Sequence, residues 1–169
     1  MAICVTPLDT NEHDRDSFDC GKEPLNNYFK KVAGQTNKRH ISRTSVLVDD
    51  ASPQEVLGFV TIVMAKVETS DLPGNLSKKL EHVTAVPLIA RLGVDVKHQG
   101  KGAGGRLLRH ALLEMIKINE SIGVPFVVVD AKDGAEDFYL NYGFEPFLDS
   151  ANRLFITMND LLSNFTDSE

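Results

Sequence analysis

The sequence has few residues that could form covalent or metal cross-links. It contains only two cysteines, Cys4 and Cys20, and they form neither a C-x-x-C pair nor a metal-ligand spacing. This excludes a disulfide framework and a cysteine-based metal centre. None of the five histidines has a partner at metal-ligand spacing, so we expect no bound metal. Reduced thiols are the normal state in the cytoplasm, which is therefore the expected location.

Long apolar runs and targeting patterns are also missing. The longest apolar run, residues 56–67, is interrupted by Lys66 and is shorter than the roughly 20 residues that a membrane-spanning helix needs. The first residues show no signal-peptide pattern, and the chain has no internal repeat or low-complexity tract. A P-loop is excluded because no G-x-x-x-x-G-K-[ST] stretch occurs.

Length and charge set the remaining bounds. At 169 residues the chain is long enough for one domain with a sizeable core. We expect a single domain over residues 1–165 and a disordered tail over 166–169. The formal net charge of −6 argues against a protein that coats nucleic acid unspecifically, although it permits a local basic patch.

Hydrophobic periodicity and turn residues predict a mixed α/β chain. One helix is expected with Pro24 in its first turn and an end near Gly34, and residues 69–84 are expected to form a loop with a short helix. A second helix should follow the glycines after residue 100, and a third should cover residues 134–140. Strands are expected at residues 3–8, 43–49, 55–67, 89–94, 125–129, 143–148 and 153–158.

Residues 89–104 contain the most informative pattern. A short apolar strand, residues 89–94, precedes a turn that holds Gly100, Gly102 and Gly104, and a strongly helical run follows. A glycine-rich turn at a helix start exposes consecutive backbone N–H groups at the positive end of the helix dipole. This arrangement favours a site for a phosphate or pyrophosphate.

The same glycines also match the dinucleotide-binding pattern G-x-G-x-x-G, formed by Gly100, Gly102 and Gly105. A later strand ending in Asp130 would supply the acidic residue of that fold. However, a polar segment, residues 95–99, separates the strand from the first glycine, whereas a dinucleotide turn follows its strand almost directly. The pattern also lies past the middle of the chain, which leaves too few residues for the remaining βαβ units.

A second interpretation accounts for three segments in the right order. Residues 99–104, Gln-Gly-Lys-Gly-Ala-Gly, resemble the Q/R-x-x-G-x-G/A loop that holds the coenzyme A pyrophosphate in GNAT N-acetyltransferases. Residues 91–95 resemble the bulged central strand of that family, and residues 138–144 resemble its F-Y-x-x-x-G-F signature. The resemblance implies a mixed, mostly antiparallel sheet of six to seven strands, flanked by helices and splayed at the cofactor site.

The resemblance also implies an acetyl-CoA site and a catalytic residue. Backbone groups of Leu92, Gly93 and Val94 would pair with pantetheine, and the Val94 N–H would stabilise the oxyanion. Tyr139 would contact the cofactor and protonate the leaving thiolate as the general acid, while Tyr142 is expected in the core. The pyrophosphate would be held by the backbone of Gln99, Gly100, Lys101, Gly102, Ala103 and Gly104.

Other roles around this site stay open. Asp95 is expected to cap the turn after its strand. Glu68 is one candidate general base, although an amine with a pKa near neutral needs none. Either Lys132 or Asp133 could occupy a further position that contacts the cofactor.

One stretch is strongly basic. Between Gly21 and Arg43 six basic residues accompany one acid, Glu23, so this stretch carries +5 and the rest of the chain −11. With the sequence of residues 18–21, this pattern is similar to GNAT toxins of toxin–antitoxin pairs. The similarity implies an aminoacyl-tRNA acceptor and a ribbon-helix-helix antitoxin, and it allows a homodimer. The candidate tRNA-binding residues are Lys30, Lys31, Lys38, Arg39 and Arg43.

Two alternatives to the toxin remain from the sequence. The chain could acetylate a small-molecule amine or a protein amino group, or it could be a non-catalytic acyl-CoA-binding module. The basic stretch favours the toxin over an ordinary acetyltransferase, and Tyr139 with the intact glycine loop argues against the binding module.

Overall fold

The computed structural model describes residues 2–131, 134–148 and 152–166. It contains two compact units. The first unit comprises Met1–Val63 with Ile89–Ala111, and the second comprises Met64–Leu88 with Leu112–Glu169. The expected domain boundary at residue 165 stays a prediction, and residues 167–169 of the expected tail lie outside the described part.

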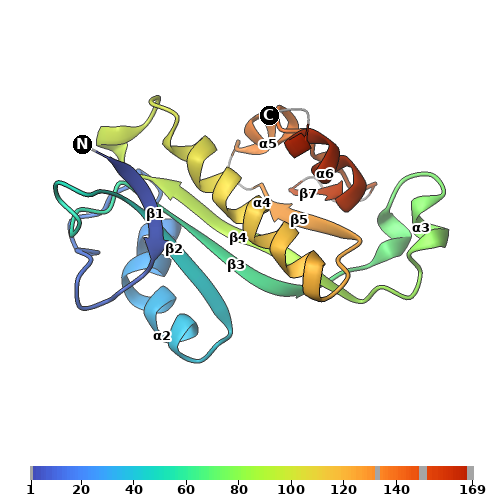
Figure 1. Ribbon diagram of the computed structural model, residues 1–169, viewed down its shortest axis with the longest axis horizontal. Coiled ribbons are helices and arrows are strands. Elements are labelled where there is room, and N and C mark those ends of the chain that lie inside the picture. Colours follow the sequence, from blue (N-terminus) through green and yellow to red (C-terminus); the bar gives the residue numbers. More distant parts are fainter. Residues whose placement is uncertain (1, 132–133, 149–151, 167–169) are drawn as a thin grey trace. The chain divides into compact units, whose positions relative to one another are not determined.

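The strands confirm the predicted mixed α/β class (Figure 1). Their order in one seven-stranded sheet is β1-β2-β3-β4-β5-β7-β6. The pairs β1–β2, β2–β3, β5–β7 and β6–β7 are antiparallel, and β4 and β5 are parallel. The strands are β1 Ile3–Pro7, β2 Ser42–Asp49, β3 Gly58–Lys66, β4 Ala85–Val94, β5 Phe126–Asp130, β6 Glu145–Pro146 and β7 Arg153–Thr157.

Helices occur in each region where one was expected, and one further helix lies near the end of the chain. The α-helices are α1 Glu23–Asn27, α2 Ala33–Lys38, α3 Leu76–Lys79, α4 Ala103–Ser121, α5 Glu136–Leu140 and α6 Met158–Thr166. A π-helical turn, η1 Tyr28–Val32, joins α1 to α2, and two 3₁₀ turns are η2 Thr69–Asp71 and η3 Val96–His98. None of the described helices combines the length and apolar character needed to cross a membrane.

The first helix does not end near Gly34, and that prediction was wrong. The helical segment α1-η1-α2 continues to Lys38. Gly34 instead permits a close approach, because a Cβ there would lie 2.9 Å from Thr10 Cγ2 and 3.2 Å from Arg15 Nη1. The π-helical turn also shifts the buried face: Ala33 is fully buried, while Val32 is 41% exposed.

Three phenylalanines form the centre of the first unit. The rings of Phe29 and Phe59 stack at 4.5 Å between centroids, and Phe18 meets their edges at 4.9 and 5.6 Å. These side chains join the first helix to the sheet, together with a set of smaller buried residues. That set contains Leu8, Cys20, Ala33, Val46, Val48 and Val56. Burial of this cluster therefore holds the helical segment α1-η1-α2 against β2 and β3.

The second unit is centred on β5 and β7. Residues 126–129 are fully buried, and Phe126 faces Thr157 across the strand pair in a register that ends with Asp130 opposite Arg153. The helix α6, which follows β7 directly, was not predicted. Its local signal is a cap, because the Thr157 hydroxyl accepts the backbone N–H of Asp160 at 3.2 Å.

Candidate active site

The glycine loop lies between η3 and α4 and presents unpaired backbone donors. Gly100 and Gly102 have φ angles of +77° and +85°, a left-handed conformation that glycine adopts without steric cost. A Cβ at either position would meet no atom within 4 Å, so the space beside the loop is open. In the described part of the chain, the backbone N–H groups of residues 99–105 have no protein acceptor.

These donors have the arrangement that a pyrophosphate requires. The 19-residue helix α4 starts at Ala103, so its first N–H groups and its positive dipole end point out of the loop. Consecutive N–H groups around two left-handed glycines form an anion-binding nest. The predicted set from Gln99 to Gly104 therefore lies together in one unit, as the sequence pattern indicated.

The Gln99 side chain has a different task from its backbone. Its Nε2 donates to the carbonyl of Val94 at 2.9 Å and to the carbonyl of Cys20 at 3.1 Å. The side chain thus ties the loop to the end of β4 and to residues 18–21, and its two amide hydrogens are already engaged. Only the backbone of Gln99 remains available for a phosphate.

Asp95 caps the turn after β4, as predicted. Its carboxylate accepts the backbone N–H of Lys97 at 2.9 Å and that of Asp19 at 3.1 Å, and the residue is 5% exposed. The backbone N–H of Val96 in turn donates to the Asp19 carbonyl at 2.8 Å. Asp95 therefore joins the start of the glycine loop to the segment before the basic helix.

Replacing Asp95 by alanine should lower the free energy of unfolding by about 1–3 kcal/mol, because buried N–H groups lose their acceptor. The loop should also shift, so acetyl-CoA should bind more weakly. Urea unfolding of the variant measures the first effect. Asp50→Ala is the control, since that carboxylate accepts one backbone N–H at an exposed position and should change stability by less than about 0.5 kcal/mol. Equal losses in the two variants would contradict this role for Asp95.

The segment of residues 18–21 connects the glycine loop to α1. Asp19 Oδ1 accepts the N–H of Gly21 at 2.8 Å and the side-chain amide of Asn26 at 2.9 Å. Asn26 Oδ1 accepts the N–H of Cys20 at 2.9 Å. Sequence reasoning missed Asn26, and an amide three positions into a helix gives no distinctive signal. This network connects α1, the start of the helical segment that contains Lys30, Lys31 and Lys38, to the turn before the glycine loop.

The predicted pantetheine residues lie at the end of β4, immediately before that turn. Gly93 is buried, and a Cβ there would lie 3.1 Å from the Phe59 ring and 3.5 Å from Cys20 Sγ. Leu92 and Val94 are half-buried. The absence of a side chain at Gly93 therefore lets the phenylalanine core approach the strand, which is a packing reason for the glycine.

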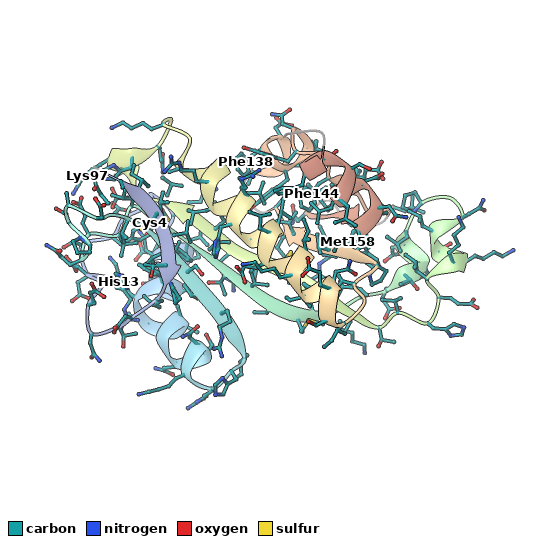
Figure 2. The ribbon with its side chains drawn as sticks, in the orientation of Figure 1. Cys4, His13, Lys97, Phe138, Phe144 and Met158 are labelled. Atoms are coloured by element: carbon teal, nitrogen blue, oxygen red, sulfur yellow. The ribbon has the colours of Figure 1, made fainter. Side chains whose placement is uncertain are left out.

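Tyr139 lies on α5 in the second unit and is only 4% exposed. Its ring meets Phe138 at 5.0 Å and Phe144 at 5.8 Å, and both neighbours are labelled in Figure 2. Burial, with a smaller contribution from the charge of Asp130, raises the pKa of Tyr139 well above its usual range. A phenol is protonated at neutral pH even at its ordinary pKa, and the raised pKa makes Tyr139 a weaker proton donor than an exposed tyrosine.

Tyr142 does not lie in the core, and that prediction was wrong. The residue is 41% exposed, and its ring contacts Phe138 at 5.2 Å. On the short helix α5 the buried position falls to Tyr139, because only one side of the helix faces the unit's interior. Lys132 and Asp133, the other candidates near the cofactor, lie outside the described residues. Glu68 is exposed, just before η2.

The five candidate tRNA-binding residues all lie in the first unit, but they do not form one set. Lys30, Lys31 and Lys38 line a hollow of about 760 Å³ between the first helical segment and the end of β1. Arg39 is exposed at the end of α2. Arg43 donates to the Asn37 carbonyl at 2.8 Å and contacts His40, so it caps the end of α2.

The comparisons with known proteins agree with this geometry. The family model described as an acetyltransferase (GNAT) domain matches residues 41–146. A probable toxin TacT of Sinorhizobium fredii is 30% identical over 94% of this chain and 93% of its own length. A tRNA-acetylating toxin of Mycobacterium tuberculosis is 32% identical over 87% of each chain.

A solved structure extends the likeness to the whole fold. AtaT complexed with acetyl-methionyl-tRNAfMet matches with a TM-score of 0.86 and 25% identity, over 97% of this chain and 99% of that one. The family model covers more than half of the chain and includes both the glycine loop and Tyr139. The chain therefore belongs to the GNAT acetyltransferase family.

Proposed function

We propose that this protein transfers the acetyl group of acetyl-CoA to the α-amino group of aminoacyl-tRNA and thereby acts as a translation-blocking toxin in the cytoplasm. The observation that carries the proposal is the combination, in one compact unit, of an anion-binding nest and a basic helical segment joined to it by hydrogen bonds. Two relatives of similar length, a probable toxin and a tRNA-acetylating toxin, support the choice of acceptor.

The proposed chemistry uses few protein groups. The N–H groups of residues 99–104 hold the pyrophosphate, and the backbone of residues 92–94 holds the pantetheine arm. The amine attacks the thioester carbonyl carbon, and the negative charge that develops on the oxygen is stabilised by the Val94 N–H. When the C–S bond breaks, the thiolate takes a proton from Tyr139, and the proton lost by the amine passes through water to restore the Tyr139 phenol.

The product explains the toxicity. An acetylated α-amino group is an amide, whose nitrogen is no longer nucleophilic, so the modified aminoacyl-tRNA cannot accept a peptide. A cell that carries such an enzyme needs an inhibitor, and a ribbon-helix-helix antitoxin is the proposed partner. A homodimer is proposed as the assembled form.

The basic stretch provides the test of the acceptor. Replacing Lys30, Lys31, Lys38 and Arg39 by alanine should reduce acetylation of bulk charged tRNA and relieve growth arrest, while acetyl-CoA binding stays unchanged. Binding of tRNA to the native protein should weaken steeply with salt, by about one unit of log–log slope for each phosphate contact. Incorporation of labelled acetyl into the tRNA pool is the measurement.

A control variant removes the same charge elsewhere, at Lys66, Lys78, Lys79 and Lys117, four lysines away from the basic stretch. It should acetylate tRNA as the native protein does. Polyamines and free amino acids are assayed in parallel. Transfer to one of these amines, with no label in the tRNA, would contradict the toxin and support a small-molecule acetyltransferase.

A further inference from the structure

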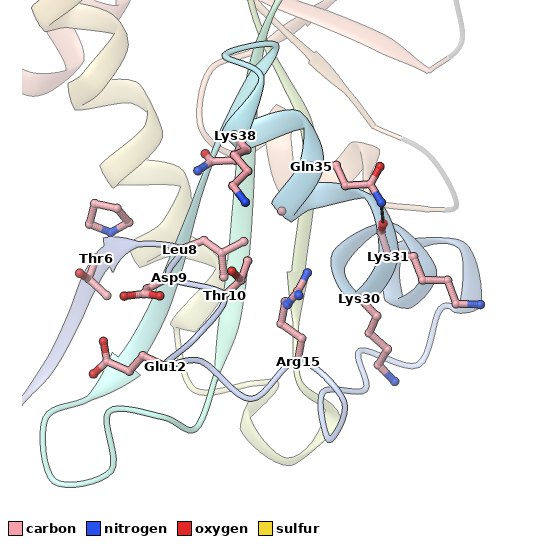
Figure 3. A pocket seen from close by; sticks show the side chains of 13 residues that line it. Thr6, Leu8, Asp9, Thr10, Glu12, Arg15, Lys30, Lys31, Gln35 and Lys38 are labelled. Atoms are coloured by element: carbon pink, nitrogen blue, oxygen red, sulfur yellow. Dashed lines mark hydrogen bonds between the residues drawn. The ribbon is translucent and has the colours of Figure 1, made fainter.

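The hollow between β1 and the first helical segment contains a cation that the basic stretch does not include. Arg15, from the loop before α1, lines it together with Lys30, Lys31 and Lys38 (Figure 3). Two carboxylates, Asp9 and Glu12, lie on the β1 side. With a volume of about 760 Å³, the hollow has the size of a small-molecule binding site.

Arg15 is held in position before any ligand arrives. Its Nη1 donates to the carbonyl of Phe29 at 3.3 Å, and the residue is half-buried. The guanidinium lies against Gly34, where a Cβ would come within 3.2 Å of Nη1. A guanidinium that is already oriented loses little conformational entropy when it binds an anion. The N–H groups that remain on Arg15 can donate to a phosphate.

The charges of the hollow fit a nucleotide better than a free anion. Arg15 and the lysines of the first helical segment make one side of the hollow basic, which favours a phosphate at Arg15. Carboxylates on the β1 side would repel a simple anion and accept hydrogen bonds from ribose hydroxyls or base amines. Asp9 already accepts the N–H of Asn11 at 2.9 Å, which leaves its second oxygen for such a donor.

We propose that this hollow is a nucleotide subsite for the tRNA acceptor and that Arg15 binds a backbone phosphate there. The inference rests on the proposed function and adds to it a residue and a location. It also gives a reason for Gly34, since a Cβ at that position would clash with Thr10 Cγ2 at 2.9 Å and press on the Arg15 guanidinium at 3.2 Å.

The test is tRNA binding as a function of salt, with the full chain and bulk tRNA. Arg15→Gln should weaken binding about tenfold and reduce the log–log salt slope by about one unit. Arg15→Lys should keep the native salt slope, because the charge is kept. It should recover only part of the affinity for tRNA, because lysine lacks the planar guanidinium that can donate two parallel hydrogen bonds to a phosphate. Gly34→Ala keeps every charge, and it should weaken binding less than Arg15→Gln does, because the added Cβ presses on Thr10 and shifts the guanidinium only slightly. Lys117→Gln, the charge-matched control on α4, should bind as the native protein does.

The outcomes distinguish a failure of the subsite from a failure of the proposed function. The melting shift with acetyl-CoA shows that each variant is folded, and it should equal that of the native protein. If Arg15→Gln binds tRNA with the affinity and salt slope of the native protein, and the native protein acetylates tRNA, the subsite is overturned and the proposed function is left intact. Native protein that labels no tRNA overturns both. Hexaglutamate, a short acidic peptide, is tested as a second ligand. If Arg15→Gln loses hexaglutamate binding but binds tRNA as the native protein does, the subsite is overturned in favour of an acidic protein ligand.

Discussion

Replacing Tyr139 by phenylalanine is expected to lower the rate of acetyl transfer by about 10²–10⁴-fold, the usual contribution of a general acid. The ring that packs against Phe138 and Phe144 is kept, so the fold and the affinity for acetyl-CoA should change little. The measurement is a single-turnover rate with acetyl-CoA and charged tRNA, together with the dissociation constant of acetyl-CoA.

Tyr142→Phe is the matched control for this experiment. It removes the same hydroxyl group three residues away on the chain, at a position that is 41% exposed. We expect a native rate in this variant. A native single-turnover rate in Tyr139→Phe would show that Tyr139 serves only packing, and the proton donor would have to be sought elsewhere.

The second large effect is expected at the glycine loop, where Gly102→Glu should abolish acetyl-CoA binding. The substitution places a negative charge and a side chain in the open space that the pyrophosphate would fill. For the native protein, acetyl-CoA at about 100 times its dissociation constant should add roughly 2.7 kcal/mol of stability. A melting scan with and without acetyl-CoA measures that shift, which should vanish in the variant.

Gly74→Glu separates binding from backbone strain. Gly74 also has a left-handed φ, +62°, and a Cβ there would meet no atom within 4 Å. Both variants therefore lose about 1–2 kcal/mol for a non-glycine residue in this conformation, yet only Gly102→Glu should lose the ligand-induced shift. A Gly102→Glu protein that binds acetyl-CoA with native affinity would exclude this loop as the phosphate site.

The loop could be identified from the sequence because its chemistry is local. A pyrophosphate is held by backbone N–H groups of consecutive residues, so the spacing of Gly100, Gly102 and Gly104 before a helix contains most of the necessary information. The cap formed by Asp95 is also a local feature, because the backbone N–H that it accepts belongs to Lys97, two residues away. The antiparallel pair β2–β3 also follows from a short connection, residues 50–57, between two apolar runs.

Where a buried face depends on packing between distant segments, the sequence was insufficient. Leu25, Tyr28, Phe29 and Val32 have the spacing of one apolar face of an α-helix, but the π-helical turn buries Ala33 and leaves Val32 exposed. Tyr139 and Tyr142 are equally aromatic in sequence, and only the packing of α5 decides which one is buried. The helix α6 was missed because its cap, Thr157, is also the last residue of β7, and residues 153–158 fit the pattern of a strand.

The sequence by itself determined the family and the concentration of positive charge between Gly21 and Arg43, and it predicted the anion-binding loop, because each is a property of neighbouring residues. Only the tertiary structure decided how those cations are used. It assigned Arg43 to the end of α2 and brought Arg15 to Gly34 and into the hollow with the lysines. The physical reason is that a hydrogen bond such as that between Arg15 and the Phe29 carbonyl joins residues whose proximity depends on the packed core, and no local pattern specifies it.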